Sequence, residues 1–367
     1  MAQQPRVTLK QIAERAGCSV TAVSKTLNAA RGTAAVGEAT RQRVIQIAQE
    51  MGYTPSYLAR ALQRGRTQAV GLVLTFSRGR IHHNAYWGQL IQGVQARTCE
   101  ADHDLLMISG LSDQAELERG LAHMRERRVD ALIVPTLRCS ASYRELLDQL
   151  DAPIVLLGGG EPSPHPVVES DLASGCQEAV AHLADLGHRS VLYVGLAGAF
   201  QERPRARAEI LATAAAACGM TLHRTELTLS VMERDVLGVD GDVTTAAYAD
   251  ECRVRFAAAL PDLPPATAVI AYSERVGFGV CAALTEAGLR VPEDVSVLAF
   301  DNIYSNLGLQ PLTVVDPRSE EVGARAAELA LQLIEAGDDR GAFHGLVEGV
   351  PSRLVVRAST GPVGQGW

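Results

Sequence analysis

The chain has 367 residues, of which 47% are apolar, so it is long enough for two or three domains and too apolar for global disorder. No run approaches the length of a membrane span, and the polar segment Met1–Lys10 is unlike a signal peptide, so we expect a cytoplasmic protein without membrane contact. The seven cysteines are scattered and form no Cys-x-x-Cys pair, which favours reduced thiols over disulfides or a zinc site.

The net charge of −8 is unevenly distributed along the chain. Residues 1–66 carry ten Lys and Arg against three acidic residues, whereas the remainder carries 24 against 39. A basic segment on an acidic body is typical of a nucleic-acid-binding domain joined to a sensor domain. Charge alone also leaves open a basic surface that is merely solvated.

Three helices are predicted in the basic segment. Thr8-Leu9-Lys10-Gln11 fits a capping box, and apolar residues follow at helical spacing until Gly17, which can end the helix. Ser19 is a good N-cap for a second helix, and a third is expected over residues 38–51. A helix, a tight glycine turn and a second helix form the pattern of a helix-turn-helix domain.

The second helix is predicted to have two different faces. One face is small or apolar and can pack on the first helix: Ala22, Val23, Thr26 and Leu27. The other is mostly polar with one cation, which suits the DNA major groove: Val20, Thr21, Ser24, Lys25 and Asn28. A three-helix bundle that binds protein is the alternative, but charge, spacing and the polar face together favour DNA.

After Thr67 the sequence alternates between short apolar runs and helical patterns. Strands are predicted over residues 69–75, 105–108, 131–135, 154–157, 191–194, 268–271 and 295–300, with helices such as 117–127 and 176–186 between them. The alternation predicts parallel α/β sheets, and about 300 residues suffice for two lobes. Ligands of such sheets bind beyond the carboxyl ends of the strands, here in a cleft between the lobes.

Several motifs resemble the lactose/galactose-repressor (LacI/GalR) family over nearly the whole chain. They are VTLKQIAERAGCSVTAVSKTLN (residues 7–28), GYTPSYLARALQRGRTQAVGLV (52–73), NAYW (84–87), LGHRS (186–190) and GLRVPEDVSV (288–297). The resemblance implies an all-α helix-turn-helix domain (1–54), a hinge helix or linker (55–66), a core (67–360) and a short tail (361–367). The core would have the type I fold of periplasmic sugar-binding proteins, two α/β lobes between which the chain crosses three times.

The resemblance also implies which residues contact DNA. Val20 and Thr21 look like the principal base readers, and Leu62 stands where the family has a leucine that intercalates in the minor groove. Further contacts are implied for Thr8, Ser19, Ser24, Lys25, Asn28, Tyr53 and Ala59. Ala22 and Ser56 replace the family's usual threonine and asparagine, and each change removes one polar contact near the DNA backbone.

For the effector, the family pattern points to Asp171, Arg207 and Asp301, since two carboxylates and a guanidinium can hold the hydroxyls of a sugar. Ser273, Tyr86 and Trp87 are further candidates. Alternatives remain for several of them. Asp301 could be a helix cap, Arg207 a surface residue, and Tyr86 and Trp87 part of the core.

The sequence therefore predicts a homodimeric, DNA-binding transcription regulator, a repressor rather than an activator, that binds double-stranded operator DNA and a small-molecule effector, a carbohydrate or a related metabolite. No cofactor, metal or enzymatic activity is expected, because no dinucleotide fingerprint, metal spacing or nucleophile motif occurs. Two rivals fit less well. A solute-binding protein would need a signal peptide and no basic segment, and an enzyme would need a catalytic set. No heptads follow Ser359, so a tetramerising coiled coil is not expected.

Overall fold

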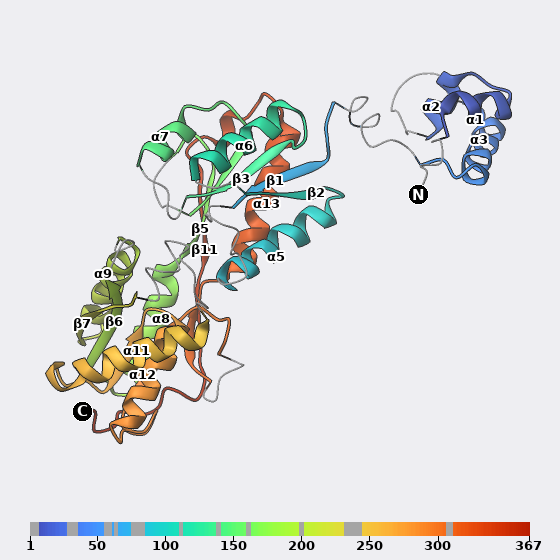
Figure 1. The fold of residues 1–367 in the computed structure, drawn as a ribbon. Helices are drawn as coiled ribbons and strands as arrows, with labels where there is room; N and C mark the ends of the chain where they lie inside the picture. The colour runs from blue at the N-terminus through green and yellow to red at the C-terminus, as the bar shows by residue number, and fades with distance from the viewer. Residues whose placement is uncertain are drawn as a thin grey trace. The chain divides into compact units, whose positions relative to one another are not determined.

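The computed structural model describes residues 7–27, 36–54, 61, 65–74, 85–109, 113–136, 141–158, 163–197, 202–230, 244–305 and 311–367 (Figure 1). It divides into two compact units, residues 1–69 with 123–130, and residues 70–122 with 131–367. The predictions for Asn28, Ser56, Ala59 and Leu62 lie outside the described residues.

The basic segment forms three helices, α1 (Leu9–Ala16), α2 (Val20–Leu27) and α3 (Glu38–Glu50). The capping box is present, since Gln11 N donates to Thr8 Oγ1 at 3.4 Å and Thr8 N donates to Gln11 Oε1 at 2.9 Å. Gly17 ends α1 at φ +64°, a left-handed conformation that glycine adopts readily. Ser19 Oγ then accepts from Ala22 N at 3.1 Å and starts α2. The predicted helices and caps of this segment are confirmed.

A small core of its own holds these helices together. The side chains of Ile12, Val23 and Val44 are fully buried, and Ala13, Ala16 and Ala48 pack beside them. Each helix contributes to this cluster, so the segment has the means to fold as a separate domain.

The rest of the chain forms two six-stranded sheets. Figure 1 labels β1 and β3 in the first sheet and β6 and β7 in the second. The first sheet has the order β11-β5-β4-β3-β1-β2, and its strands run parallel from β11 to β1. Its strands are β1 (Ala69–Val73), β2 (Asp104–Ile108), β3 (Ala131–Pro135), β4 (Ile154–Leu157), β5 (Val167–Asp171) and β11 (Val347–Pro351).

The second sheet has the order β12-β10-β9-β8-β6-β7 and is parallel except for the antiparallel edge pair β10–β12. Its strands are β6 (Ser190–Ala197), β7 (Thr221–Thr228), β8 (Ala268–Ala271), β9 (Ser296–Phe300), β10 (Thr313–Asp316) and β12 (Arg353–Val355). All seven strands predicted from the sequence are present, and β5, β7, β10, β11 and β12 were not predicted.

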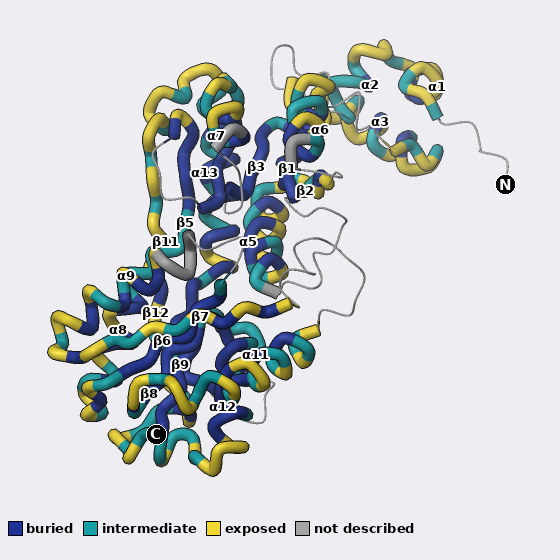
Figure 2. Tube along the Cα trace, turned by 60° about the vertical axis from the view of Figure 1, so that its left-hand side comes forward, coloured by how far each residue is buried: buried dark blue, intermediate teal, exposed yellow. Residues whose placement is uncertain are grey.

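Helices accompany both sheets and complete two lobes. The first lobe contains α5 (Ala85–Glu100), α6 (Asp113–Arg125), α7 (Ala141–Asp148) and α13 (Ser319–Ala336). The second contains α8 (Leu172–Asp185), α9 (Glu202–Ala217), α11 (Thr245–Ala259) and α12 (Glu274–Glu286), and short 3-10 turns lie at Leu260–Asp262 and Gly341–Phe343. In Figure 2 the strands are mostly dark blue and the outer sides of many helices yellow, the burial expected when helices cover a central sheet.

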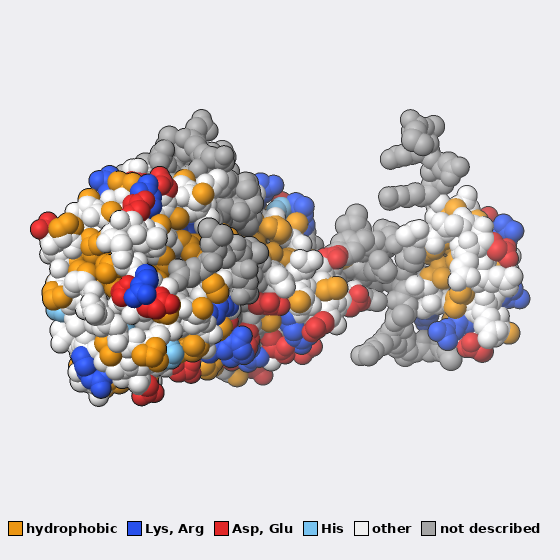
Figure 3. Space-filling model, turned by 90° about the horizontal axis from the view of Figure 1, so that it is seen from below, with side chains coloured by type: hydrophobic (Ala, Val, Ile, Leu, Met, Phe, Trp, Pro, Cys, Tyr) orange, Lys and Arg blue, Asp and Glu red, His pale blue; other side chains and the backbone are white. Residues whose placement is uncertain are grey.

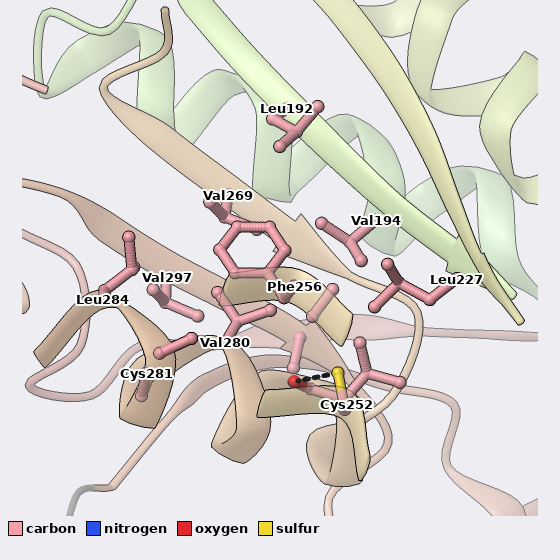
Figure 4. Packing of buried hydrophobic residues seen from close by; sticks show 14 of the residues in the cluster. Leu192, Val194, Leu227, Cys252, Phe256, Val269, Val280, Cys281, Leu284 and Val297 are labelled. Atoms are coloured by element: carbon pink, nitrogen blue, oxygen red, sulfur yellow. Dashed lines mark hydrogen bonds between the residues drawn. The ribbon is translucent and has the colours of Figure 1, made fainter. Parts of the chain in front are cut away.

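In the second lobe, successive strand residues face opposite sides of the sheet. Leu192 and Val194 pack with Phe256 of α11 and Val280 of α12, as Figure 4 shows. Their neighbours Val191 and Tyr193 pack on the other side, against α8 and α9. Two apolar layers on one sheet confirm the predicted doubly covered α/β lobe.

In the first lobe, α5 and α13 pack unusually closely. A Cβ atom at Gly93 would lie 1.8 Å from the backbone oxygen of Glu320, and one at Gly323 would lie 2.0 Å from that of Leu90. Because real Cβ atoms do not approach so near, only glycine permits this separation between the two backbones.

The chain passes between the lobes three times: from β5 to α8, from β10 to α13, and from β11 to β12. The first and third passages are joined, since Ser352 Oγ donates to the carbonyl of Asp171 at 2.7 Å and accepts from Gly175 N at 3.0 Å. At the second passage, Asp316 accepts from Arg318 N at 2.9 Å.

The last residues, 361–367, pack on the second lobe rather than project from it. Val363 N donates to Leu186 O at 2.8 Å, Gly366 N donates to Asp294 O at 3.0 Å, and Trp367 packs against the apolar cluster around Phe256. His188 is fully buried beneath them, with its Nε2 3.1 Å from Gly361 O. None of the helices in the described residues is long and apolar enough to span a membrane.

Candidate nucleic-acid interface and ligand site

Helix α2 exposes the face that the sequence predicts for DNA. Val20 is 45% exposed and Thr21 is exposed, whereas Val23 is fully buried against α1 and α3. Ser24 and Lys25 are half-buried at the border between the two faces. An exposed apolar side chain beside a hydroxyl can contact a thymine methyl group and a base edge in the major groove.

Other predicted contact residues also have structural roles in this domain. Thr8 and Ser19 cap α1 and α2 through their hydroxyl groups, as described above. Tyr53 is half-buried against the core of the three helices, and its backbone N–H donates to Ala48 O at 2.9 Å. Lys10, Arg15, Arg41 and Arg43 are exposed, which leaves the domain a basic surface. Arg15 lies 3.5 Å from Glu50 and Arg41 lies 3.6 Å from Glu38, so two of these charges are partly balanced.

Charges elsewhere on the chain are more evenly mixed. On the face drawn in Figure 3, basic and acidic side chains mostly occur in adjacent groups and not as a field of one sign. In the second lobe Arg253 pairs with Asp250 at 2.7 Å and with Glu286 at 2.9 Å. Exposed pairs of this kind add little stability. The strongest excess of basic over acidic residues therefore remains in residues 1–66.

In the second lobe, Arg207 extends from α9 over the carboxyl ends of β8 and β9. It is only 9% exposed, so it is not a surface residue. Its guanidinium lies 4.1 Å from the ring centre of Phe300 and 4.7 Å from that of Tyr272, and Nη1 donates to Tyr272 O at 2.6 Å. Within the described residues Arg207 Nε has no hydrogen-bond partner. A buried, aromatic-stacked cation with a spare donor is suited to bind a polar ligand.

Asp301 lies near this guanidinium. It follows β9 directly, has a left-handed φ of +79°, and donates its backbone N–H to Val315 O at 3.1 Å. Burial lowers the pKa of Arg207, but Tyr272, Tyr193 and Asp301 outweigh that effect and raise it above its ordinary value. Among the described residues no helix starts at Asp301, so a helix cap does not account for it. The structure brings together two of the three central effector residues predicted from the sequence.

The remaining polar candidates cap helices. Asp171 accepts from Ala173 N at 3.0 Å and from the Ser174 hydroxyl, and so starts α8 at the first passage between the lobes. Ser273 is 8% exposed and starts α12, with its Oγ 3.5 Å from Val276 N. Capping does not prevent a ligand contact, since a carboxylate or hydroxyl has further hydrogen-bonding capacity.

Glu274 is a further polar residue near this site that the sequence motifs do not predict. Its side chain is 1% exposed, and Oε2 accepts from Ile303 N at 2.6 Å and Tyr304 N at 2.9 Å, while Oε1 accepts from the Ser305 hydroxyl. Glu274 therefore holds the turn that follows Asp301. A signal was present in the sequence, because Ser273-Glu274 stands where the LacI/GalR family that the chain resembles commonly has Asn-Asp. The longer carboxylate of Glu274 can reach this turn.

The two aromatic candidates belong to the first lobe. Trp87 is 2% exposed and packs in the apolar cluster with Leu90 and Val94. Of its two predicted roles, a core residue or a ligand contact, this burial favours the core. Tyr86 is half-buried and meets the Trp87 ring edge to face, with 5.9 Å between ring centres. Of the pair, Tyr86 retains surface for a ligand.

Comparison with known proteins identifies both parts of the chain. Residues 8–56 match the family model of bacterial regulatory proteins, lacI family, and residues 180–360 match the periplasmic binding protein-like domain. Together these matches support a regulator of the LacI/GalR family. Members of this family regulate transcription by binding DNA, and this chain is a DNA-binding transcription regulator.

Individual relatives extend the likeness over the whole chain. The transcriptional repressor PurR of Pasteurella multocida is 27% identical over 363 residues, which cover 96% of this chain and 98% of PurR. The lac repressor dimer bound to operator and the anti-inducer ONPF superposes with a TM-score of 0.75 at 21% identity, covering 97% of this chain and all of that one. The regulator CelR in complex with cellobiose has a TM-score of 0.62 at 23% identity, with 96% of this chain and all of that one covered. These structures confirm the predicted two-part fold.

Proposed function

We propose that this lacI-family member is a homodimeric repressor that binds a pseudo-palindromic operator and changes its affinity when a sugar or sugar derivative binds the second lobe. The observation that carries the proposal is the pairing of two features in one chain. These are the exposed polar face of α2 and the buried Arg207 beside Asp301 at the strand ends. We divide the chain into a DNA-binding domain (1–54), a linker (55–66) and a core (67–360), with residues 361–367 packed on the second lobe.

For DNA, we propose that Val20 and Thr21 read bases and that Ser24, Lys25 and Asn28 add base or phosphate contacts. Thr8, Ser19, Tyr53 and Ala59 would support contacts to the DNA backbone, and Leu62 would act as a wedge in the minor groove. The lac repressor structure, which contains operator DNA, supports this docking mode. The two DNA-binding domains of a dimer would then bind two half-sites about one helical turn apart. We propose a cytoplasmic location, because a regulator that binds an operator must reach the DNA of the cell.

For the effector, we propose that Arg207 and Asp301 hold neighbouring hydroxyl groups and that Asp171, Ser273 and Tyr86 complete the site. Arg207 has a spare Nε–H donor, and a carboxylate is an acceptor, so the pair matches the donor and acceptor character of vicinal hydroxyls. CelR with bound cellobiose supports a carbohydrate as the effector class. The two states of the core would differ in linker geometry and thereby in operator affinity.

The first test is selection of genomic fragments by the purified protein, followed by sequencing. We expect a shared pseudo-palindrome of about 14–20 base pairs, from two half-sites at one-turn spacing. Thr21→Ala should weaken binding to that sequence about tenfold, as the loss of one base contact does, whereas Gln46→Ala on the exposed side of α3 should not. No enrichment over bulk DNA, with and without pooled sugars, would contradict the proposal.

A second test addresses the wedge. Leu62→Ala should weaken binding to the selected sequence far more than binding to random duplex DNA, because it removes an apolar group and no charge. Equal losses on both DNAs would contradict the assignment of Leu62.

The effector site is tested by a thermal-shift screen against mono- and disaccharides. Asp301→Asn should abolish the shift caused by any sugar that stabilises the wild-type protein, while operator affinity without sugar stays within about twofold. An unchanged shift would place the ligand elsewhere.

A further inference from the structure

The point at which the linker enters the core is held by one carboxylate, that of Asp130. Thr67 N donates to Asp130 Oδ1 at 2.8 Å and Oδ2 at 2.9 Å, and Gln68 N donates to Oδ2 at 2.7 Å. In the reverse direction, Asp130 N donates to Ala69 O at 2.8 Å. Thr67 and Gln68, just before β1, and Ala69, its first residue, are therefore bound to a residue far away in sequence.

The backbone of this segment depends on such an anchor. Gln68 has a φ of +56°, a left-handed conformation that residues with a side chain rarely adopt without compensation. Thr67 is 4% exposed, so water has little access to its N–H, which would be costly to leave unpaired. A carboxylate that accepts from both N–H groups supplies the stronger, charge-assisted type of hydrogen bond.

The position of Asp130 is itself well defined. Helix α6 ends just before it, where Arg128 N donates to His123 O at 2.8 Å and Arg127 N donates to Met124 O at 2.9 Å. Arg127 has a φ of +51°, which completes a Schellman motif. Asp130 is followed directly by β3, a strand that pairs with both β1 and β4.

The compact units of the chain also group the residues around Asp130 with the residues that it binds. Residues 123–130 fall together with residues 1–69, apart from the first part of α6 and from β3. The turn that carries Asp130 thus groups with residues 67–69, although it is continuous in sequence with a central strand of the first lobe.

We propose that Asp130 is a positioning residue that couples the core to the linker. Its carboxylate fixes the direction from which the chain enters β1, so that a displacement at the start of β3 is passed to residues 65–68. This role rests on the proposed function, in which linker geometry controls operator affinity. Asp130 is not among the residues we assign to DNA or effector contacts.

The test compares full-length wild-type protein with Asp130→Asn, Asp130→Glu and a matched control. The Asn side chain keeps the size but replaces one acceptor oxygen by an NH₂ donor that faces the two N–H groups. The Glu side chain keeps both oxygens and the charge. The control is Glu251→Gln, which alters a second-lobe carboxylate that accepts from Ser230 N at 2.8 Å and Ser230 Oγ at 3.1 Å.

Two readouts are needed. Hydrogen exchange of peptides that contain residues 65–69 should become at least tenfold faster in Asp130→Asn and stay unchanged in Glu251→Gln. The ratio of affinities for the genomically selected fragment and for a random duplex should fall at least fivefold in Asp130→Asn, at constant affinity for the random duplex. Such a factor lies within the usual range for coupling between sites. Asp130→Glu should recover part of both effects, which a merely structural loss would not show.

Three results would overturn the proposal. Unchanged exchange in Asp130→Asn would mean that the carboxylate does not hold the linker, and faster exchange with an unchanged affinity ratio would mean that the anchor does not reach DNA binding. If Asp130→Asn unfolds the first lobe, a folded Asp130→Glu variant with wild-type exchange and affinity ratio supports the anchor. A folded Asp130→Glu variant with faster exchange of residues 65–69 and a lower affinity ratio than the wild type refutes the proposal. A wild-type protein without preference for the fragment would refute the proposed function, and exchange would still decide whether Asp130 holds residues 65–69.

Discussion

The close contact between α5 and α13 makes the substitution Gly93→Ala a sharp test of the packing. The new Cβ atom would lie 1.8 Å from Glu320 O, and the contact becomes tolerable only beyond 3.0 Å. The two backbones would have to separate by roughly 1.2 Å at this point, because neither atom lies on a side chain that could rotate away.

The expected cost follows from what α13 contributes to the first lobe. Val322, Ala326, Ala330 and Leu333 of this helix are buried in the same apolar cluster as Leu90. Overpacking a core costs about 1–3 kcal/mol, and a gap of about 1 Å forfeits up to half of the dispersion attraction of the atoms that separate. We therefore expect Gly93→Ala to destabilise the first lobe by about 3 kcal/mol.

Helix α5, which carries Gly93, also offers a matched control. Gly88 is exposed, and a Cβ atom there would meet nothing within 4 Å. Gly88→Ala should stabilise the lobe by about 0.5–1 kcal/mol, because alanine loses less backbone entropy than glycine on entering a helix. The two substitutions thus differ in sign although they are chemically identical.

Tryptophan fluorescence can report on this lobe alone. The protein has two tryptophans, Trp87 in the first lobe and Trp367 on the second. In a Trp367→Phe background, urea unfolding followed through Trp87 gives the free energy of the first-lobe transition from its midpoint and slope. Equal midpoints for Gly93→Ala and Gly88→Ala would refute the assignment of a backbone contact at Gly93.

Three further predictions concern caps, protonation and the C-terminal residues. Thr8→Ala should destabilise α1 by about 1 kcal/mol, seen as faster hydrogen exchange of its amides, while Thr8→Ser, which keeps the hydroxyl, should match the wild type. Burial lowers the pKa of His188, so the unfolded chain takes up a proton near pH 6.5 whereas the folded lobe does not. The free energy of unfolding should therefore be highest above that pH and fall below it, by up to about 1.4 kcal/mol per pH unit. His188→Gln should flatten this dependence, and an identical pH profile in the variant would contradict it. Trp367→Ala should cost about 2 kcal/mol in thermal unfolding, less than a fully buried tryptophan, and wild-type stability would show that residues 361–367 do not close the lobe.

The sequence predicted the elements whose signal is local. The caps of α1 and α2 depend on residues three positions apart, and central strands such as β3, β4 and β8 are unbroken apolar runs because both faces are covered. The edge strands β7 and β12 lack this signal. Every residue of β7 except Leu227 is exposed or half-buried, and β12 is three residues long, so neither contains an unbroken apolar run.

The candidate site was only partly predictable for a related reason. The family resemblance selects Arg207 and Asp301, but only the fold shows that Phe300 and Tyr272 flank the guanidinium. The role of Glu274 depends on a turn 29 residues later, and that of Asp130 on a segment 62 to 63 residues earlier. The periodicity of apolar residues does not reveal hydrogen bonds over such separations. A single acidic residue in a sequence is therefore most simply interpreted as exposed to solvent.

The order of the strands has a consequence for synthesis on the ribosome. The helices α1 to α3 are complete once the first 50 residues have been made, and they contain their own core. The first sheet, in contrast, receives its edge strand β11 only after the whole second lobe except β12 and the C-terminal residues has been translated. Until then a nascent chain carries a finished DNA-binding domain on two unfinished lobes. Premature termination anywhere between these points would release a fragment with a folded three-helix segment and an incomplete core.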